Sequence, residues 1–406
     1  MTTNAALTPA AAKTPEATLR EVVEALAPIE RLAGSEGERE ASEWIAARLG
    51  EAGLEARVEE ERFYDGFAAQ IATLSAAAAA AGLAALTRRG RALGLIGGAV
   101  AGALIADDIS NGPRAFRRLA GEERATWNVV AEIGPANAER TLVLLAHHDA
   151  ARTGRIFSQA GQRALGELAP GVVERLDTSL PVWWPVLAGP ALVVVAGATG
   201  RRGLAAAGAA LSAATAATLT EVARSPVVPG ANDNLSAVAA LVAVAEELQR
   251  DPVEGLRVVL ASCGAEEVLQ GGIHGFAARH LAEMDRERTW VLNLDSVGSP
   301  ELALLEGEGE LVMEDFFDRG WRDLIARVAE RERIPIRRGL RSWASTDTVI
   351  PSRMRFPTAC LVSVDEYKAI SNYHWPTDTP ENLNYPTVAC AADLALALAR
   401  ELAPAA

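Results

Sequence analysis

The pattern of apolar and polar residues predicts buried strands flanked by helices. Three short, mostly apolar runs lead directly into polar residues at their carboxyl ends: 141–146, 256–263 and 290–294. Runs of this kind are typical of strands that are buried on both faces of a sheet. Three other stretches predict helices: 16–29, 38–49 and 237–248. Apolar and charged residues alternate over 54–63, which predicts a half-exposed strand. We therefore expect an α/β fold.

Two longer segments break this pattern, because each is uncharged except at a central arginine-containing turn. The uncharged stretches are 67–86 and 92–106 in the first segment, and 181–199 and 203–220 in the second. The turns carry Arg88, Arg89, Arg91, Arg201 and Arg202. Three of the four stretches approach the length of about twenty apolar residues that spans a bilayer core. We therefore predict two transmembrane helical hairpins, 67–106 and 181–220.

The alternative is that two alanine-rich hairpins are buried inside a soluble protein, because alanine is nearly neutral for membrane insertion. A helix without charge on any face lacks the polar stripe of a surface helix, which favours the membrane. Each hairpin crosses the bilayer twice, so the three remaining parts lie on one side: 1–66, 107–180 and 221–406. The arginine turns favour the cytoplasm, which favours an extracytoplasmic side for these parts. Three arginines at the other end of the first hairpin weaken that orientation: Arg114, Arg117 and Arg118.

Composition excludes some classes of protein. The net charge of −14 and the pI near 5.0 argue against a nucleic-acid-binding protein. Three cysteines are too few and too scattered for a disulfide framework or a zinc–thiolate site. No charged region followed by an apolar region opens the chain, so we expect no cleavable signal peptide.

The first candidate chemical group is His147-His148-Asp149, which follows the apolar run 141–146. Ligand sites in open α/β sheets lie at the carboxyl ends of strands, so we expect this group at the edge of the sheet. The triplet suits a metal site, because Asp149 can accept the second ring N–H of His147 and so fix its tautomer. Alone, the triplet is a weak signal, because it is more often a loop histidine beside a solvated acid.

Acidic residues also follow the other two apolar runs. Glu266 and Glu267 come shortly after 256–263, and Asp295 follows 290–294 directly. Two adjacent acids at the end of a buried strand are costly unless positive charge lies close by. A metal ion supplies that charge: one acid can bind the ion, while its neighbour takes a proton from the water that the ion activates.

Two further candidates lie in loops. Asp233 precedes the helix 237–248, where free N–H groups and the helix dipole favour a carboxylate; an ordinary helix cap is the alternative interpretation. His374 lies in a proline-containing loop. Asp378 is close enough in sequence to orient His374 or to cap the following turn.

Taken together, these groups form an ordered series of His-x-Asp, Asp, Glu-Glu, Asp and His. Two histidines and three carboxylates suit two zinc ions about 3.5–4 Å apart. The series resembles the co-catalytic zinc aminopeptidases, a family of bacterial leucyl aminopeptidases and glutamate carboxypeptidases with transferrin-receptor and glutaminyl-cyclase relatives. The resemblance covers residues of about 15–66, 107–150 and 225–400. It implies the zinc exopeptidase fold: a mixed, mostly parallel central sheet flanked by helices, here with two inserted hairpins.

The resemblance also implies a role for each residue. Two zinc ions per chain are expected on five ligands: His147, Asp233, Glu267, Asp295 and His374. Asp233 is expected to bridge the ions, Glu266 to act as the general base, and Asp149 to support His147 in catalysis. The distribution of the other ligands between the two ions stays open. The implied reaction is removal of N-terminal residues from a peptide substrate, with a carboxypeptidase or dipeptidase outcome left open.

The chain departs from the family pattern in several places. Both hairpins are insertions, and they make the lipid bilayer an expected partner. Thr348 stands where the family often has the histidine of Ser-Asp-His, so the role of Asp347 in the substrate pocket stays open. His148, His274 and His280 match no ligand position, and we interpret the last two as structural.

Two alternative functions remain. The first is an inactive receptor or scaffold on the same fold, which the presence of all five expected ligands and Glu266 disfavours. The second is a single-zinc acyltransferase like the glutaminyl cyclases, which His147 and the Glu266-Glu267 pair disfavour because they suit two ions. The preferred substrate side chain and the oligomeric state are not fixed by the sequence.

Overall fold

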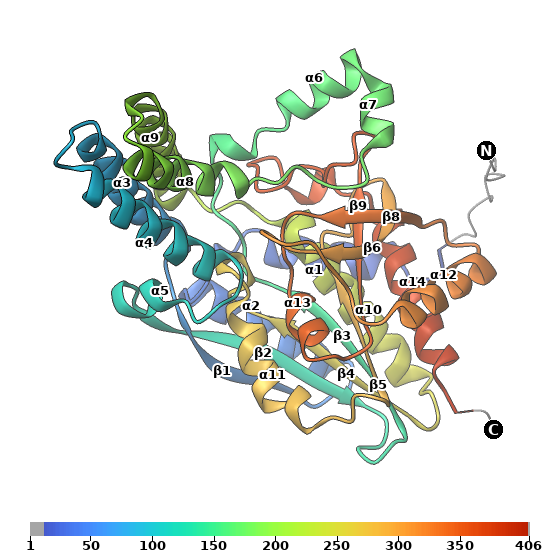
Figure 1. Cartoon of the computed structure of the whole chain (residues 1–406). Coiled ribbons are helices and arrows are strands. Elements are labelled where there is room, and N and C mark those ends of the chain that lie inside the picture. The colour runs from blue at the N-terminus through green and yellow to red at the C-terminus, as the bar shows by residue number, and fades with distance from the viewer. Residues whose placement is uncertain (1–11, 405–406) are drawn as a thin grey trace.

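One nine-stranded sheet organises the computed structural model, which describes residues 12–404 (Figure 1). The strands are β1 Ala56–Tyr64, β2 Glu123–Ile133, β3 Arg140–His147, β4 Leu256–Cys263, β5 Thr289–Leu294, β6 Glu301–Glu308, β7 Glu314–Asp315, β8 Arg337–Ser342 and β9 Thr358–Val364. Their order is β1-β2-β4-β3-β5-β9-β6-β7, and β8 pairs with β6. The central pairs β4–β3, β3–β5 and β5–β9 are parallel, while β1–β2, β2–β4 and β6–β9 are antiparallel. The expected mixed sheet is therefore confirmed, but it is not mostly parallel: the described strands form four parallel and four antiparallel pairs.

Helices cover both faces of this sheet. Successive residues of a strand point to opposite faces. Leu142 and Leu144 of β3 therefore pack into one core, and Val143 and Leu145 pack into the other. The first core is covered by α1 Glu16–Leu26, α2 Glu36–Glu51, α10 Ser236–Arg250, α12 Arg319–Glu332 and α14 Tyr385–Glu401. The second is covered by α11 Gly271–Arg279 and α13 Val349–Arg353.

The connecting segments contain short helices. Three of them are α5 Ala115–Ala120, α6 Ala160–Leu168 and α7 Pro170–Arg175. Single turns of helix are η1 Arg155–Phe157, η2 Ala231–Leu235, η3 Glu266–Val268, η4 Leu281–Glu283 and η5 Pro380–Asn382. The turns η2 and η3 lie at the carboxyl edge of the central strands and carry candidate site residues.

The two uncharged segments form four helices that project from the sheet-containing part of the molecule (Figure 1). They are α3 Phe67–Ala85, α4 Arg91–Ile109, α8 Trp184–Thr199 and α9 Arg202–Arg224. Helices α3 and α4 pack against each other, as do α8 and α9, and the two pairs also pack together. Small residues permit the close approach: a Cβ on Gly197 would lie only 2.5 Å from the backbone nitrogen of Leu95.

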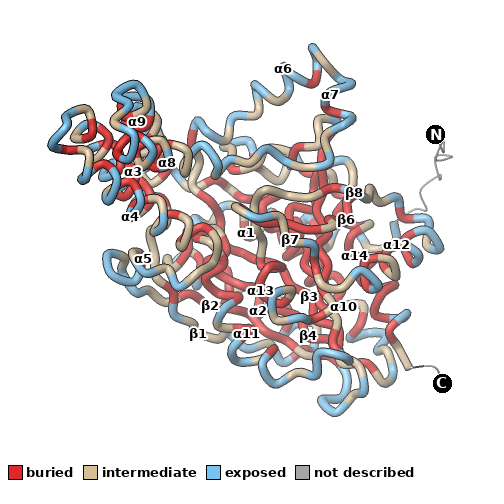
Figure 2. The backbone as a smooth tube through the Cα atoms, in the orientation of Figure 1, coloured by how far each residue is buried: buried red, intermediate tan, exposed pale blue. Residues whose placement is uncertain are grey.

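The outer surface of these four helices is apolar. Leu93 and Ile96 of α4 are 65% and 61% exposed, and much of the bundle is exposed in Figure 2. Three of the helices are long and apolar enough to cross a membrane: α3, α4 and α9. The fourth, α8, is shorter. Large exposed apolar surface is unusual on a soluble monomer and is typical of a surface that contacts lipid or another protein.

Candidate metal and catalytic centre

Three adjacent parallel strands bring the predicted acidic and histidine side chains to one edge of the sheet. The order β4-β3-β5 places the end of β3, with His147, between the ends of the other two strands. Glu266 and Glu267 follow β4, and Asp295 follows β5. Carboxyl ends of parallel strands lie at the same edge of a sheet, which explains why residues distant in sequence converge.

Asp233 reaches this edge on the turn η2, which precedes α10. Asp378 holds this turn in place. Its two carboxylate oxygens accept hydrogen bonds from the backbone N–H groups of Asn232 at 2.7 Å and of Asp233 at 3.1 Å. We expected Asp378 to orient His374 or to cap the following turn, and the structure gives it this different contact. Asn234 adds a second anchor, because its side chain accepts the Ser296 N–H and donates to the Leu294 carbonyl.

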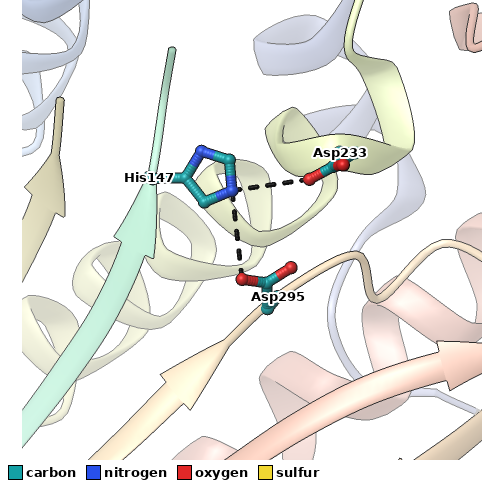
Figure 3. Close-up of side chains that lie close together, drawn as sticks. All are labelled: His147, Asp233 and Asp295. Atoms are coloured by element: carbon teal, nitrogen blue, oxygen red, sulfur yellow. Dashed lines mark ion pairs between the residues drawn. The ribbon is translucent and has the colours of Figure 1, made fainter. Parts of the chain in front are cut away.

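The first group of candidate ligands is His147, Asp233 and Asp295 (Figure 3). The Nε2 atom of His147 lies 3.4 Å from Oδ1 of Asp233 and 3.9 Å from Oδ2 of Asp295. All three side chains are buried. The candidate ligand atoms of the group lie within 4.8 Å of one another, which is close enough for one metal ion to contact all three.

The second group is Asp233, Glu267 and His374. The Nε2 atom of His374 lies 3.1 Å from Oδ2 of Asp233 and 3.0 Å from Oε2 of Glu267. Asp233 therefore belongs to both groups, with Oδ1 directed at His147 and Oδ2 at His374. The sequence left the distribution of ligands open. The structure gathers His147 with Asp295 in the first group and Glu267 with His374 in the second, and a third group of His147, Glu266 and Glu267 links the two.

These residues are chemically suited to bind zinc. Imidazole nitrogens and carboxylate oxygens are typical zinc ligands. Oε1 of Glu267 is buried without a hydrogen-bond partner among the described residues, and the buried Nε2 of His374 faces two carboxylate oxygens without a hydrogen bond of good geometry to either. Buried polar atoms are normally paired, and leaving them unpaired costs free energy. A cation in the group of Asp233, Glu267 and His374 would satisfy these atoms.

Electrostatics point the same way. Burial raises the pKa of Glu266 and Glu267, and it raises the pKa of Asp295 to about 7. Burial lowers the pKa of His374, but Glu267 and Asp233 outweigh it and raise the value to about 10. Burial raises the pKa of Asp233, but the two histidines outweigh it and bring the value below its usual range. So many acids in a buried space need positive charge beside them.

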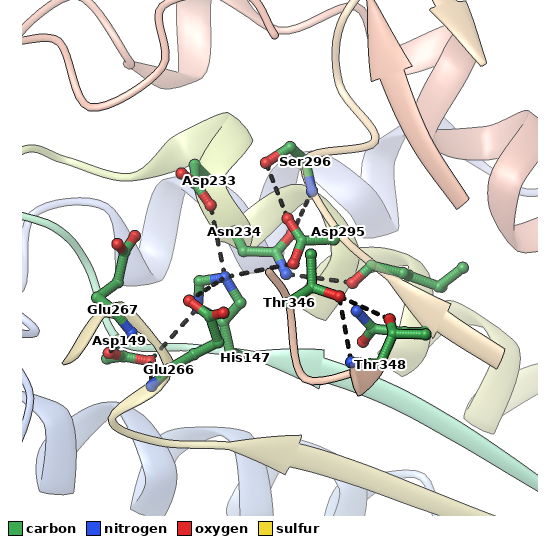
Figure 4. A network of polar contacts seen from close by, with 12 residues as sticks. His147, Asp149, Asp233, Asn234, Glu266, Glu267, Asp295, Ser296, Thr346 and Thr348 are labelled. Carbon is green, nitrogen blue, oxygen red and sulfur yellow. Dashed lines mark hydrogen bonds and ion pairs between the residues drawn. The ribbon is translucent and has the colours of Figure 1, made fainter. Parts of the chain in front are cut away.

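Asp149 fixes the backbone of both glutamates. Its two oxygens accept the N–H groups of Glu266 and Glu267, each at 3.0 Å (Figure 4). Oδ1 also lies 3.3 Å from Nδ1 of His147, on the side of the ring away from Asp233. Asp149 thus contacts the expected ligand His147, as its place in the triplet suggested, and additionally holds the turn that follows β4.

Arg31 is a structural residue of the site that the sequence did not reveal. Its fully buried guanidinium donates to the carbonyls of His148 at 2.8 Å and of Pro229 at 2.7 Å. It therefore ties the end of β3 to the chain that leads into Asp233. Burial lowers the pKa of Arg31 to about 10, so the side chain remains charged at neutral pH. A single arginine in a helix-to-helix connection carries no sequence signal for this role.

Asp347 lies at the margin of the site. It is buried, and neither of its carboxylate oxygens has a hydrogen-bond partner among the residues that the structure describes. Burial raises its pKa to about 8, and the nearby Asp149 and Asp295 contribute to the rise. Thr348 forms hydrogen bonds with the Thr346 hydroxyl. Both threonines lie to the lower right of Asp295 in Figure 4.

The remaining histidines have structural contacts. His148 Nδ1 lies 2.9 Å from the Ser262 hydroxyl, and burial lowers its pKa to about 4. His280 Nε2 lies 2.7 Å from a carboxylate oxygen of Glu59 on the edge strand β1. His274 lies in α11, with Nε2 3.3 Å from Oδ1 of Asn111.

The comparisons with known proteins agree with this fold. The model of Peptidase family M28 matches residues 205–399. The structure is similar to an aminopeptidase from Aneurinibacillus sp. strain AM-1, with 13% identity, a TM-score of 0.57 and coverage of 97% of this chain and 95% of that one. A zinc aminopeptidase from Bacillus subtilis is similar at 15% identity, with a TM-score of 0.54 and the same two coverages. A glutaminyl cyclase from Bacteroides thetaiotaomicron is similar at 12% identity, with a TM-score of 0.57 and coverage of 96% and 99%. No match was found among the curated proteins.

The family match covers slightly less than half of the chain, and the solved structures cover nearly all of it. At such low identity the solved structures show the fold alone, which is the zinc exopeptidase fold. The family match covers Asp233, Glu266, Glu267, Asp295 and His374, while His147 lies before it. The resemblance to the co-catalytic zinc peptidases is therefore confirmed, and the Peptidase family M28 match supports a zinc metallopeptidase.

Proposed function

We propose that this protein is a membrane-anchored aminopeptidase that uses two zinc ions. The observation that carries the proposal is the position of Asp233 between the two ligand groups. Its two oxygens face different histidines, at 3.4 and 3.1 Å, as a carboxylate that bridges two ions would. Bound zinc supplies a Lewis acid that polarises a peptide carbonyl and lowers the pKa of water.

Glu266 is the proposed general base. Its side chain is 10% exposed and lies beside the first group, with Oε2 3.9 Å from Nε2 of His147. A carboxylate in this position can take a proton from the attacking water and pass it to the leaving amine. Glu267 points to His374 instead, which supports the division of roles between the two neighbouring acids.

The charge of the site favours a substrate with a free N-terminus. The five expected ligands include three carboxylates, and Glu266 and Asp149 add two more, so the carboxylates outnumber the four positive charges of two zinc ions. The buried Arg31 directs its N–H groups at backbone carbonyls, so it is not presented to a substrate carboxylate. An ammonium group is therefore better matched to this site than a C-terminal carboxylate.

Turnover tests this proposal. The purified protein should hydrolyse members of a panel of aminoacyl-anilides, and N-acetylated versions of the same compounds should resist it. A chelator should abolish turnover, and added zinc should restore it. Failure to hydrolyse the panel, together with cleavage of peptides from their C-terminus, would contradict the aminopeptidase assignment. Failure on all peptides would favour the inactive scaffold.

A single-zinc glutaminyl cyclase is the second candidate, because the group of Asp233, Glu267 and His374 is complete by itself. The similarity to the Bacteroides thetaiotaomicron enzyme supports the same fold for that alternative. Cyclisation of an N-terminal glutamine releases ammonia without breaking a peptide bond. Ammonia release from a glutaminyl peptide, without anilide hydrolysis, would therefore replace our proposal with this one.

The membrane part of the proposal rests on the four-helix bundle. Three of its helices are long enough to span a bilayer, and Trp184 at the start of α8 is 51% exposed, as an interfacial tryptophan would be. The protein should sediment with membranes and resist alkaline carbonate extraction. Recovery as a soluble monodisperse monomer without detergent would overturn the membrane assignment and leave the peptidase assignment intact.

Contacts at the base of the bundle also favour cytoplasmic arginine turns. Of the three arginines at the base of the first hairpin that oppose this orientation, Arg114 and Arg117 are engaged within the protein, while Arg118 is exposed. Arg117 pairs with Asp108, and Arg114 donates to the Leu269 carbonyl. The arginines at the turns, by contrast, include four exposed ones: Arg88, Arg89, Arg201 and Arg202. We therefore place the catalytic part on the extracytoplasmic side.

A further inference from the structure

Gln270 contacts the proposed general base directly. Its side-chain Nε2 donates to Oε1 of Glu266 at 3.0 Å and to the Ser345 carbonyl at 3.0 Å. Gln270 is 1% exposed, so no solvent competes for these bonds. The other oxygen of Glu266, Oε2, is the one that lies towards His147. The two oxygens of Glu266 are thus distinguished: one is held by an amide and the other faces the ligand groups.

The orientation of the Gln270 amide is set from outside the active site. Oε1 of Gln270 accepts from Nδ2 of Asn111 at 2.7 Å. Asn111 in turn accepts from Arg114 through Oδ1. Arginine only donates hydrogen bonds, so it fixes the Asn111 oxygen on its own side. With its oxygen on the Arg114 side, Asn111 presents its N–H groups to Gln270. The Gln270 oxygen accepts from them, so the Gln270 N–H groups point towards Glu266.

The segment that supplies these contacts is the end of the first hairpin. Asn111 comes two residues after the end of α4, Arg114 follows in the same connection, and Arg117 lies in α5. Arg117 donates to the Val268 carbonyl at 2.6 Å, and Arg114 donates to the Leu269 carbonyl. Residues 268, 269 and 270, which follow the two glutamates, are therefore each held by a side chain from residues 111–117.

The held segment needs such support. Leu269 and Gln270 both have positive φ values, of 67° and 59°. Non-glycine residues are uncommon in this region, and two in succession persist only when their surroundings impose the conformation. The buried contacts from residues 111–117 supply that constraint. The inserted hairpin therefore contributes to the geometry of the base as well as to the proposed membrane anchor.

We propose that Gln270 is a positioning residue for Glu266, and that Asn111 and Arg114 set its orientation, so that the end of the inserted hairpin holds the base in its working position. The proposal rests on the proposed function, because it takes Glu266 as the base. The amide donor on Oε1 fixes the carboxylate, and it leaves Oε2 free to accept the proton of water. The relay runs Arg114 to Asn111 to Gln270 to Glu266, and every step is a hydrogen bond between named atoms.

The first test replaces Gln270 with methionine, which keeps a similar shape and removes the donor. Gln270→Met should lower kcat by about tenfold or more, because a small displacement of a catalytic group is costly, while KM and zinc content stay within about twofold of wild type. In a Glu266→Gln background the same substitution should change kcat by less than about twofold, because there is no longer a base to position. An equal loss in both backgrounds would overturn the proposal, since it would mark a merely structural role.

The second test acts one step further away. Asn111→Asp keeps the size of the side chain and its contact with Arg114, but it presents only acceptors to Gln270. The Gln270 amide should then turn its oxygen towards Glu266, and kcat should fall by about tenfold. Combined with Gln270→Met, Asn111→Asp should add less than about twofold, because its effect passes through Gln270. Wild-type kcat in the single variant, or full additivity in the double variant, would contradict the relay.

Gln249→Met is the matched control, because Gln249 also donates to a backbone carbonyl, that of Gly53, but lies in an exposed contact of α10. It should leave kcat unchanged. Melting temperature and zinc content separate misfolding from loss of positioning in every variant. Should the wild-type protein hydrolyse none of the panel, the proposed function fails first. A crystal structure of Gln270→Met then decides the relay, and an unmoved Glu266 carboxylate would overturn it.

Discussion

Arg117 and Asp108 form a buried ion pair at the base of the inserted helices, with Nη2 of the arginine 2.8 Å from Oδ1 of the aspartate. The side chains are only 1% and 3% exposed. Asp108 lies near the end of α4, and Arg117 lies in α5 and contacts the Val268 carbonyl. The pair therefore fastens the bundle to the loop that carries the two glutamates.

Breaking this pair should destabilise the protein strongly. Asp108→Ala leaves the Arg117 charge buried and unpaired, which costs about 3–5 kcal/mol. The melting temperature in detergent should fall clearly. Glu16→Ala is the control, because it breaks an exposed pair with Arg20 at 2.7 Å and exposed pairs contribute little. Equal melting temperatures for Asp108→Ala and wild type would show that the pair does not hold the bundle.

The two adjacent glutamates should respond differently to the same substitution. Glu266→Gln should keep both zinc ions and lower kcat by about 10²–10⁴-fold, the usual contribution of a positioned proton acceptor. Glu267→Gln should lose zinc, because Oε2 of Glu267 is a candidate ligand atom 3.0 Å from His374. Elemental analysis and turnover of the same preparations separate the two effects. Near-normal turnover by Glu266→Gln would show that the roles are wrongly assigned.

Asp149 should matter for both metal affinity and turnover. The two oxygens of Asp149 accept the backbone N–H groups of Glu266 and Glu267. In Asp149→Asn, one of these oxygens becomes an NH2 group, which can only donate, so one of the two hydrogen bonds is lost. Residues that orient metal ligands typically contribute about 10–100-fold to affinity or activity. Competition with a zinc indicator should show weaker binding, and kcat should fall as well. An unchanged zinc affinity and kcat would leave Asp149 as an ordinary turn residue.

Glu308 gives a prediction for the dependence of stability on pH. Burial, reinforced by Glu310, raises the pKa of Glu308 well above its usual value. In the folded state Glu308 therefore keeps its proton to a higher pH than it does in the unfolded state. The contribution of the protonated Glu308 to stability is fully present at acid pH, below the unfolded-state pKa. It is lost as pH rises through the folded-state pKa. Glu308→Gln should raise the melting temperature at pH 8 relative to wild type, and the difference should shrink at pH 4.

Glu306 on the same strand is the matched control with the opposite sign. Burial raises its pKa, but Arg338 and Arg322 outweigh burial and lower the pKa of Glu306 below its usual value. Glu306→Gln should therefore reduce stability at pH 8, where the carboxylate is paired. A stabilising effect of Glu306→Gln, or a destabilising effect of Glu308→Gln at pH 8, would contradict this account of the two carboxylates.

The strand-end residues could be predicted from sequence because the strands that carry them are marked by short apolar runs. His147, Glu266 and Asp295 follow such runs, and parallel pairing of the strands brings them together. The structure then added what spacing cannot give, namely which candidate ligands lie close to one another. Glu267 lies with His374, and both face Asp233.

Contacts made by loops could not be predicted, because they depend on backbone conformations that apolar periodicity does not encode. Arg31 donates to carbonyls near both His147 and Asp233, and Asp378 accepts the backbone N–H of Asp233. Asn111 reaches Gln270 only because the first hairpin returns to the loop after β4. The sequence predicted the hairpin as an insertion, and nothing in its pattern indicated a contact with the catalytic residues.

Zinc stoichiometry tests the central claim most directly, because the account rests on one carboxylate shared between two ions. Elemental analysis of the purified wild-type protein should give two zinc ions per chain, and Asp233→Ala should lose both. His147→Ala and His374→Ala should each weaken one site and leave about one ion bound. A wild-type protein with a single zinc, or an Asp233→Ala variant that keeps two, would contradict the shared dizinc site.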